Sequence, residues 1–161
     1  MISVRAEIVD LVQRIQTLDH RFKLREGQQQ FLSEALPPAT REDLIALQAV
    51  VPFRLPPSYV ELLSVSNGIR NFKWIDEHLL SSHERVANPA LDDWPECPEI
   101  WFFIFGDDTS DSVAFDRNTQ DAAGEMEVVE VMNYRQAERW PTLIDFLRDY
   151  EKRLVDWLAQ D

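Results

Sequence analysis

Six consecutive apolar residues, Ile100-Trp101-Phe102-Phe103-Ile104-Phe105, lie past the middle of the chain. Aromatic and β-branched side chains favour the extended conformation, because they pack well on a pleated surface. A strand with apolar residues at every position, rather than at alternate ones, is typically buried on both faces. The run therefore predicts a central strand, and a fold for this chain has to cover both of its sides.

The sequence before this run has the spacing of helices. From Ile8 to Phe22 the apolar residues recur mostly at steps of three and four, which predicts a helix over residues 2–22. A short second helix is expected over residues 26–35, ended by two prolines.

Two further helices are expected before residue 70. Thr40, with Asp43 three positions later, has the pattern of a capped helix start, and Pro52 ends that helix. Its apolar residues are Leu44, Ile45, Leu47 and Val50. The next helix opens at Pro56-Pro57-Ser58 and ends at Asn67-Gly68, since both of these residues tolerate the left-handed conformation of a helix C-terminus.

The period then changes to that of strands. Strands are expected over residues 71–76, 100–105, 112–116 and 126–131, with a turn at 106–111 and loop with one helical turn over 77–99. A last helix begins after Trp140-Pro141. The expected order is helices, then an antiparallel meander, then one helix, and this order predicts an α+β fold. A length of 161 residues suits a single domain over 1–161.

Composition excludes several classes of function. Cys97 is the only cysteine, so an internal disulfide and a multi-cysteine zinc site are ruled out, and a reducing, cytoplasmic compartment is expected. Charges interrupt the N-terminus, and no stretch reaches the roughly 20 apolar residues of a membrane span. None of the four glycines stands in a phosphate-loop or dinucleotide pattern, so we expect no cofactor.

The negative charge is concentrated in one quarter of the chain. Residues 91–130 hold twelve acids and one base, which is −11 of the total net charge of −13. Such a field repels nucleic acid and anionic membranes and attracts a basic partner. The competing interpretation is a surface that only keeps the protein in solution.

Candidate catalytic and metal sites are weak. His78 and His83 are five residues apart, where a helical zinc pair needs four, and the neighbours of Cys97 include acids rather than the bases that activate a thiol. The carboxylates of Asp107-Asp108-Thr109-Ser110-Asp111 suggest a cation loop, but the glycine and glutamate of a calcium loop are missing. A turn capped by its own aspartates is the simpler interpretation.

Two motifs resemble the SUKH superfamily. The first is Leu55-Pro56-Pro57-Ser58-Tyr59 followed by Asn67-Gly68, and the second is Phe105-Gly106-Asp107 followed by the strand that ends at Asp116. Residues 142–147 are similar to the closing helix of that family. The resemblance covers about residues 38–150 and leaves residues 1–37 as an N-terminal helical extension. Ser110 departs from the glycine expected before Asp111.

The resemblance implies a noncatalytic binding domain, such as a bacterial immunity protein that neutralises a cognate toxin. The first alternative is a regulatory scaffold in cell-wall or signalling control. The second alternative is a metal-dependent hydrolase that uses the Asp107–Asp116 carboxylates. A nuclease toxin has to be basic to grip phosphates, so an acidic surface could occupy its groove. We therefore expect the acidic segment to bind the partner, through Asp107, Asp108, Asp111, Asp116, Glu127 and Glu130.

Overall fold

The computed structural model describes residues 1–73, 77–87, 101–106, 112–133 and 135–160. Its helices are α1 (Val4–Arg25), α2 (Arg41–Val50), α3 (Pro57–Val65), α4 (Ser82–Ala87) and α5 (Leu143–Leu158). Its strands are β1 (Glu34–Ala35), β2 (Ile69–Lys73), β3 (Glu77–Leu79), β4 (Trp101–Gly106), β5 (Ser112–Asp116), β6 (Val128–Met132) and β7 (Arg135–Trp140).

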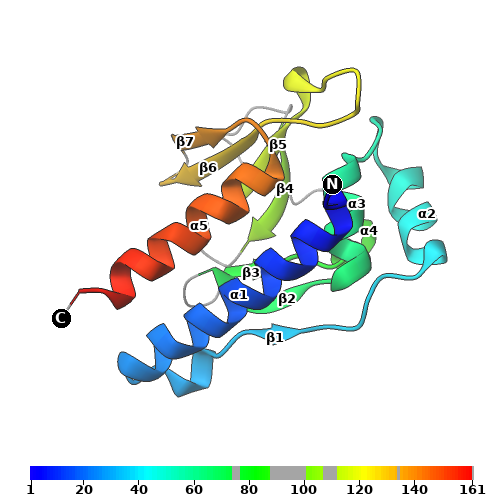
Figure 1. Cartoon of the computed structure of the whole chain (residues 1–161). Helices are drawn as coiled ribbons and strands as arrows, with labels where there is room; N and C mark the ends of the chain where they lie inside the picture. Colours follow the sequence, from blue (N-terminus) through cyan, green and yellow to red (C-terminus); the bar gives the residue numbers. More distant parts are fainter. Residues whose placement is uncertain (74–76, 88–100, 107–111, 134, 161) are drawn as a thin grey trace.

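The strands form one antiparallel sheet in the order in which they follow along the chain, from β1 to β7. The predicted meander is therefore confirmed. The two longest helices, α1 and α5, lie side by side over the sheet (Figure 1). An antiparallel sheet with N-terminal helices and a C-terminal helix is the α+β fold that the sequence predicts.

β4 is buried on both faces, as its apolar run predicts. Phe102 and Phe105 belong to the main core, whereas Phe103 packs in a smaller cluster with Ala114, Val129 and Val131. Residues two apart in a regular strand lie on the same side of the sheet. A register shift between Phe103 and Phe105 explains why these two residues lie in different clusters. Phe105 stacks on Phe72 of β2 and also contacts Phe146 of α5, so the strand joins the sheet to the C-terminal helix in the core.

Helix starts follow the predicted side-chain chemistry. The Thr40 hydroxyl accepts from the Asp43 backbone N–H at 3.1 Å, and the Asp43 carboxylate accepts from the Thr40 N–H at 2.8 Å. This reciprocal capping box fixes the first turn of α2. Thr142 caps α5 in a similar way through the N–H of Asp145.

Asn67 and Gly68 join α3 to the sheet. Gly68 has φ +103°, and a Cβ there would lie 3.1 Å from Leu36 Cδ1 and 3.2 Å from the Leu79 carbonyl oxygen. The Asn67 side chain accepts from the Ser82 N–H at 2.7 Å and so holds the start of α4. α3 itself ends two residues earlier than predicted, at Val65.

Three local predictions were wrong. Residues 26–35 form a 3-10 turn (Gln29–Phe31) and β1 rather than a helix. β1 is held by the pairing of Glu34 and Ala35 with β2, which the local sequence does not reveal. β3 lies in the stretch expected to be loop. β7 was not predicted, because this edge strand is polar and five of its six residues are exposed. Residues 107–111 of the predicted turn at 106–111, and residues 88–100, lie outside the described residues.

The N-terminal extension is part of the main core. Ile8, Leu11, Val12 and Ile15 of α1 are buried there. On the surface, Arg14 pairs with Glu151 and Arg148 pairs with Glu7, which ties α1 to α5 twice. Arg25 donates to the carbonyls of Trp157 (2.9 Å), Leu158 (3.2 Å) and Gln160 (2.9 Å), so it satisfies acceptors that the end of α5 leaves open.

Candidate functional site

Of the six carboxylates predicted to bind a partner, Asp107, Asp108 and Asp111 lie outside the described residues. The other three occupy β5 and β6 or the loop before β6. Their surroundings differ from the exposed acidic face that the sequence suggested.

Asp116 and Glu127 share one arginine. Arg139 of β7 donates to Asp116 Oδ2 at 2.9 Å and also binds the Glu127 carboxylate. Asp116 is buried, and its other oxygen accepts from the Asn118 N–H at 3.1 Å. The Glu127 side chain is 39% exposed, so of the three described residues it is the one that reaches solvent.

Glu130 is buried, so the expectation that its carboxylate points outward is wrong. Its carboxylate lies 2.8 Å from Lys73 Nζ, and Lys73 also pairs with Glu77 at 3.1 Å. Arg153 of α5 lies 3.9 Å from the second Glu130 oxygen. The sequence placed Glu130 on the solvent side because it alternates with apolar neighbours. In the fold it faces the same side as the core residue Val128, where two bases neutralise it.

The remaining described acids of the 91–130 segment also make structural contacts. Glu125 accepts from the Ser58 N–H at 2.9 Å and from the Ser58 hydroxyl at 2.6 Å, and so caps α3 from a distant loop. Asp121 accepts from the N–H groups of Ala123 and Glu125 in its own turn. All five described acids of this segment are thus used by the fold, and the clustering does not by itself require a partner.

The helix α2 exposes several of its apolar side chains. Of its residues only Leu47 is buried, whereas Ile45 is 58% and Val50 42% exposed. Ala46 and Ala49 are exposed beside them. The four recur at spacings of one and four, so they share one side of the helix.

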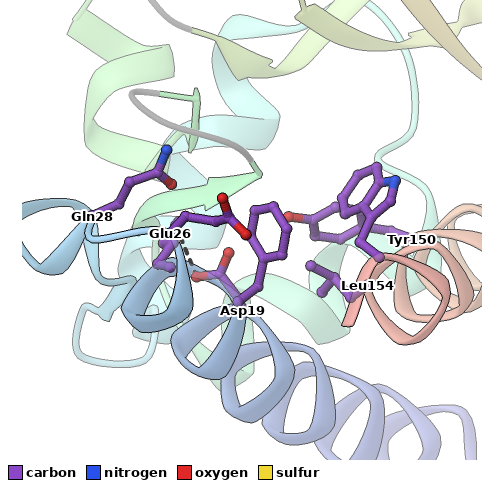
Figure 2. A pocket seen from close by; sticks show the side chains of 8 residues that line it. Asp19, Glu26, Gln28, Tyr150 and Leu154 are labelled. Atoms are coloured by element: carbon purple, nitrogen blue, oxygen red, sulfur yellow. Dashed lines mark ion pairs between the residues drawn. The ribbon is translucent and has the colours of Figure 1, made fainter. Parts of the chain in front are cut away.

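A pocket that the sequence did not reveal lies between the C-terminal part of α1 and that of α5. Figure 2 shows Asp19 and Glu26 on one side, with Tyr150 and Leu154 of α5 opposite them. Phe22 and Trp157 complete the apolar wall, with ring centroids 5.6 Å apart. The pocket encloses about 150 Å³.

A buried ion pair forms the polar part of this pocket. Lys23 Nζ lies 2.8 Å from Asp19 Oδ2, and both side chains are 2% exposed. Burial raises the pKa of Asp19, against the opposing effect of the Lys23 ammonium, and burial lowers the pKa of Lys23. Each charge thus incurs a desolvation cost that the other only partly offsets.

The backbone of β2 completes the surroundings of Lys23. Lys23 Nζ donates to the Asn71 carbonyl oxygen at 2.6 Å, and the Asn71 N–H donates to His78 Nδ1 at 2.8 Å. Asn71 has φ +51° at a register shift between β2 and β3. Because the strand is irregular here, the Asn71 carbonyl points toward the Lys23 ammonium. In regular pairing this carbonyl would point toward the next strand.

In the part of the chain that the structure describes, no three His, Cys, Asp or Glu side chains gather in a way that could hold a metal ion. His83 pairs with Asp43 at 2.7 Å, while His78 accepts from Asn71 as above. None of the helices in the described ranges is long and apolar enough to cross a membrane.

No curated protein matches the chain. The sequence model of the SMI1/KNR4 family, also called SUKH-1, matches residues 38–149, which agrees closely with the range of the resemblance described above. The matched range runs from just before α2 into α5 and contains both motifs. The chain therefore belongs to the SMI1/KNR4 (SUKH-1) family.

Proposed function

We propose that this protein is a noncatalytic immunity protein, which binds a cognate toxin in the cytoplasm and blocks its active site or its path to substrate. The observation that carries the proposal is membership of a family that includes toxin immunity proteins. The net charge of −13 supports a basic partner, such as a nuclease, whose phosphate-binding groove is positively charged.

The partner-binding face is centred on Asp107, Asp108 and Asp111, together with the exposed carboxylate of Glu127. Asp116 and Glu130, the other two residues predicted for the site, are buried in ion pairs. Asp116 holds Arg139, which in turn holds Glu127, and Glu130 holds Lys73. Asp116 acts in binding by positioning Arg139 and, through it, Glu127, whereas Glu130 and its partner Lys73 are both buried and do not contact the toxin themselves.

Charge on this face speeds encounter with the toxin. Long-range attraction between an acidic and a basic surface raises the association rate and is screened by salt, with a Debye length of about 8 Å at physiological ionic strength. Dissociation depends more on contacts that are buried once the complex has formed.

The experiment first captures the partner from source cells with the tagged protein and identifies it by mass spectrometry. Association rates are then measured at low and physiological salt for the wild type and for the variant Asp107→Asn, Asp108→Asn, Asp111→Asn, Glu127→Gln. We expect the variant to associate at least tenfold more slowly at low salt, with a flatter salt dependence.

A charge-matched control neutralises four acids elsewhere, at Asp10, Glu34, Glu42 and Asp156, all of which are exposed. If the two variants slow association equally, only total charge matters and the proposed face is wrong. Capture of a cell-wall or signalling protein instead of a toxin would favour the regulatory scaffold. Tight calcium, magnesium or manganese binding by calorimetry, lost in the Asp107 variant, would favour a hydrolase.

A further inference from the structure

The pocket between α1 and α5 is built outside the family-matched range. Every described residue that lines it lies before residue 38 or after residue 149. The matched part therefore supplies a common scaffold, whereas the two flanking segments make this cavity. A site made by the flanking segments is suited to selecting one partner among those that related proteins bind.

The size of the pocket limits what it can hold. Pockets for cofactors and drug-sized ligands have volumes of roughly 300–1,000 Å³. This pocket, at about 150 Å³, has room for one large amino-acid side chain. Single side chains that anchor protein interfaces are most often tryptophan, tyrosine or arginine.

The lining distinguishes among these three. Trp157, Phe22 and Tyr150 offer aromatic surface, while Glu26 and the buried Asp19 place two carboxylates in the same pocket (Figure 2). Asp19 is already paired with Lys23, but a tryptophan or tyrosine would bury the half-exposed Glu26 carboxylate without adding a positive charge beside it, which is costly. A guanidinium can stack on an aromatic ring and donate to carboxylates at its edge.

Two bases lie nearby and both already have partners, and the Arg25 guanidinium lies 5.4 Å from the centre of the Phe22 ring. Lys23 is bound to Asp19 and to the Asn71 carbonyl, so its ammonium is held in the floor. Arg25 pairs with Glu26 through Nε, while its terminal nitrogens bind the carbonyls at the end of α5. Glu26 keeps a 43% exposed side chain and can accept a second guanidinium. An ionised carboxylate offers about four acceptor positions.

We propose that this pocket binds an arginine side chain of the partner protein, and that the N-terminal extension thereby sets partner specificity. The proposal rests on the protein-binding function proposed above. It assigns the specific anchor to the α1–α5 pocket and the long-range attraction to the acidic face.

The first test uses the free protein and a small probe, so that it does not depend on finding a partner. N-acetyl-arginine methylamide is titrated while the indole N–H signal of Trp157 is followed by NMR. N-acetyl-citrulline methylamide, which has nearly the same shape without the charge, is the control ligand. We expect the arginine probe to shift this signal saturably, with affinity at least tenfold above that of the citrulline probe.

The variant Glu26→Gln keeps the size of the side chain and should weaken probe binding about tenfold, whereas the exposed control Asp10→Asn on the same helix should leave it unchanged. Equal binding of the two probes, or no effect of Glu26→Gln, overturns the proposal. In the complex, Glu26→Gln should raise the dissociation rate, with little change in association. If the complex forms normally and Glu26→Gln does not change its dissociation rate, the pocket proposal is refuted, whereas the proposed function is not.

Discussion

Lys73 joins two buried carboxylates, those of Glu77 and Glu130. Glu130 was expected to lie on the surface, yet its carboxylate is enclosed with Lys73 and Glu77. Alternation along a strand identifies two sides, but it does not tell which side faces helices. The bases that neutralise Glu130 come from β2 and α5, far away in sequence, and local patterns do not reveal such partners.

Removal of the Glu130 charge should therefore reduce stability. Glu130→Gln leaves Lys73 buried with Glu77 as its remaining carboxylate, and disruption of a buried pair typically costs about 3 kcal/mol. Urea unfolding measures the change. Glu138→Gln, whose side chain is 53% exposed and pairs with the neighbouring Arg153, is the control and should cost under about 1 kcal/mol. Equal losses would mean that burial of Glu130 is unimportant.

Gly68 carries a conformational and a steric requirement together. Gly68→Val places a β-branched residue at φ +103° and brings its Cβ within 3.2 Å of the Leu79 carbonyl oxygen. We expect a loss of at least about 1–3 kcal/mol in the free energy of unfolding. Gly27→Val is the matched control, because Gly27 also has positive φ but a Cβ there meets nothing within 4 Å. Thermal unfolding should show a larger loss for Gly68, and an unchanged melting temperature with abolished partner binding would contradict a structural role.

Asp19 should make stability depend on pH with an unusual sign. Because burial raises the pKa of Asp19 above its ordinary value of 3.8, the folded chain keeps a proton that the unfolded chain has already released. The stability from this group is present below pH 3.8 and is lost as the pH rises through the folded pKa. The free energy of unfolding of the wild type minus that of Asp19→Asn should thus fall over the pH interval above 3.8, as the pH rises through the folded pKa. A difference that increases over this interval in urea titrations would show the pKa is lowered instead.

Among the helices and strands, the long regular ones could be predicted from the sequence, whereas the short ones could not. The apolar spacing identified α1 and α5, and Thr40 with Asp43 marked the start of α2 within one residue. β1 and β3 have two and three residues and depend on pairing with β2, so no local period marks them. The pocket was missed for a related reason, since its two walls are more than a hundred residues apart in sequence.

The end of α5 offers a test of how the extension is held. Arg25 binds three carbonyl oxygens there, and Arg25→Leu removes these donors while it keeps much of the apolar stem. We expect about 1–2 kcal/mol lower stability, together with faster amide exchange in the last turn of α5. Arg21→Leu, which alters an exposed arginine of the same helix, is the control. Similar exchange in both variants would mean that Arg25 does not hold the helix end.

The proposed binding of a basic protein rests on the net charge of −13 together with the family. The family resemblance could be recognised from two motifs. The fold class could be predicted from the order in which helix-like and strand-like spacings of apolar residues follow along the chain. The partner could not, because recognition depends on surfaces that are assembled from distant segments. The flanking helices give this family member a pocket that its matched range alone does not form.

Neutralisation of the toxin by binding, without catalysis, can be tested by a titration of toxin activity. The captured toxin is held at a concentration well above the dissociation constant, and its activity is measured against added protein. We expect toxin activity to fall linearly to zero at a fixed whole-number molar ratio, independent of incubation time, and active toxin to be recovered after denaturing separation. Progressive inactivation by substoichiometric protein, or full toxin activity at a large excess of the protein, would contradict it.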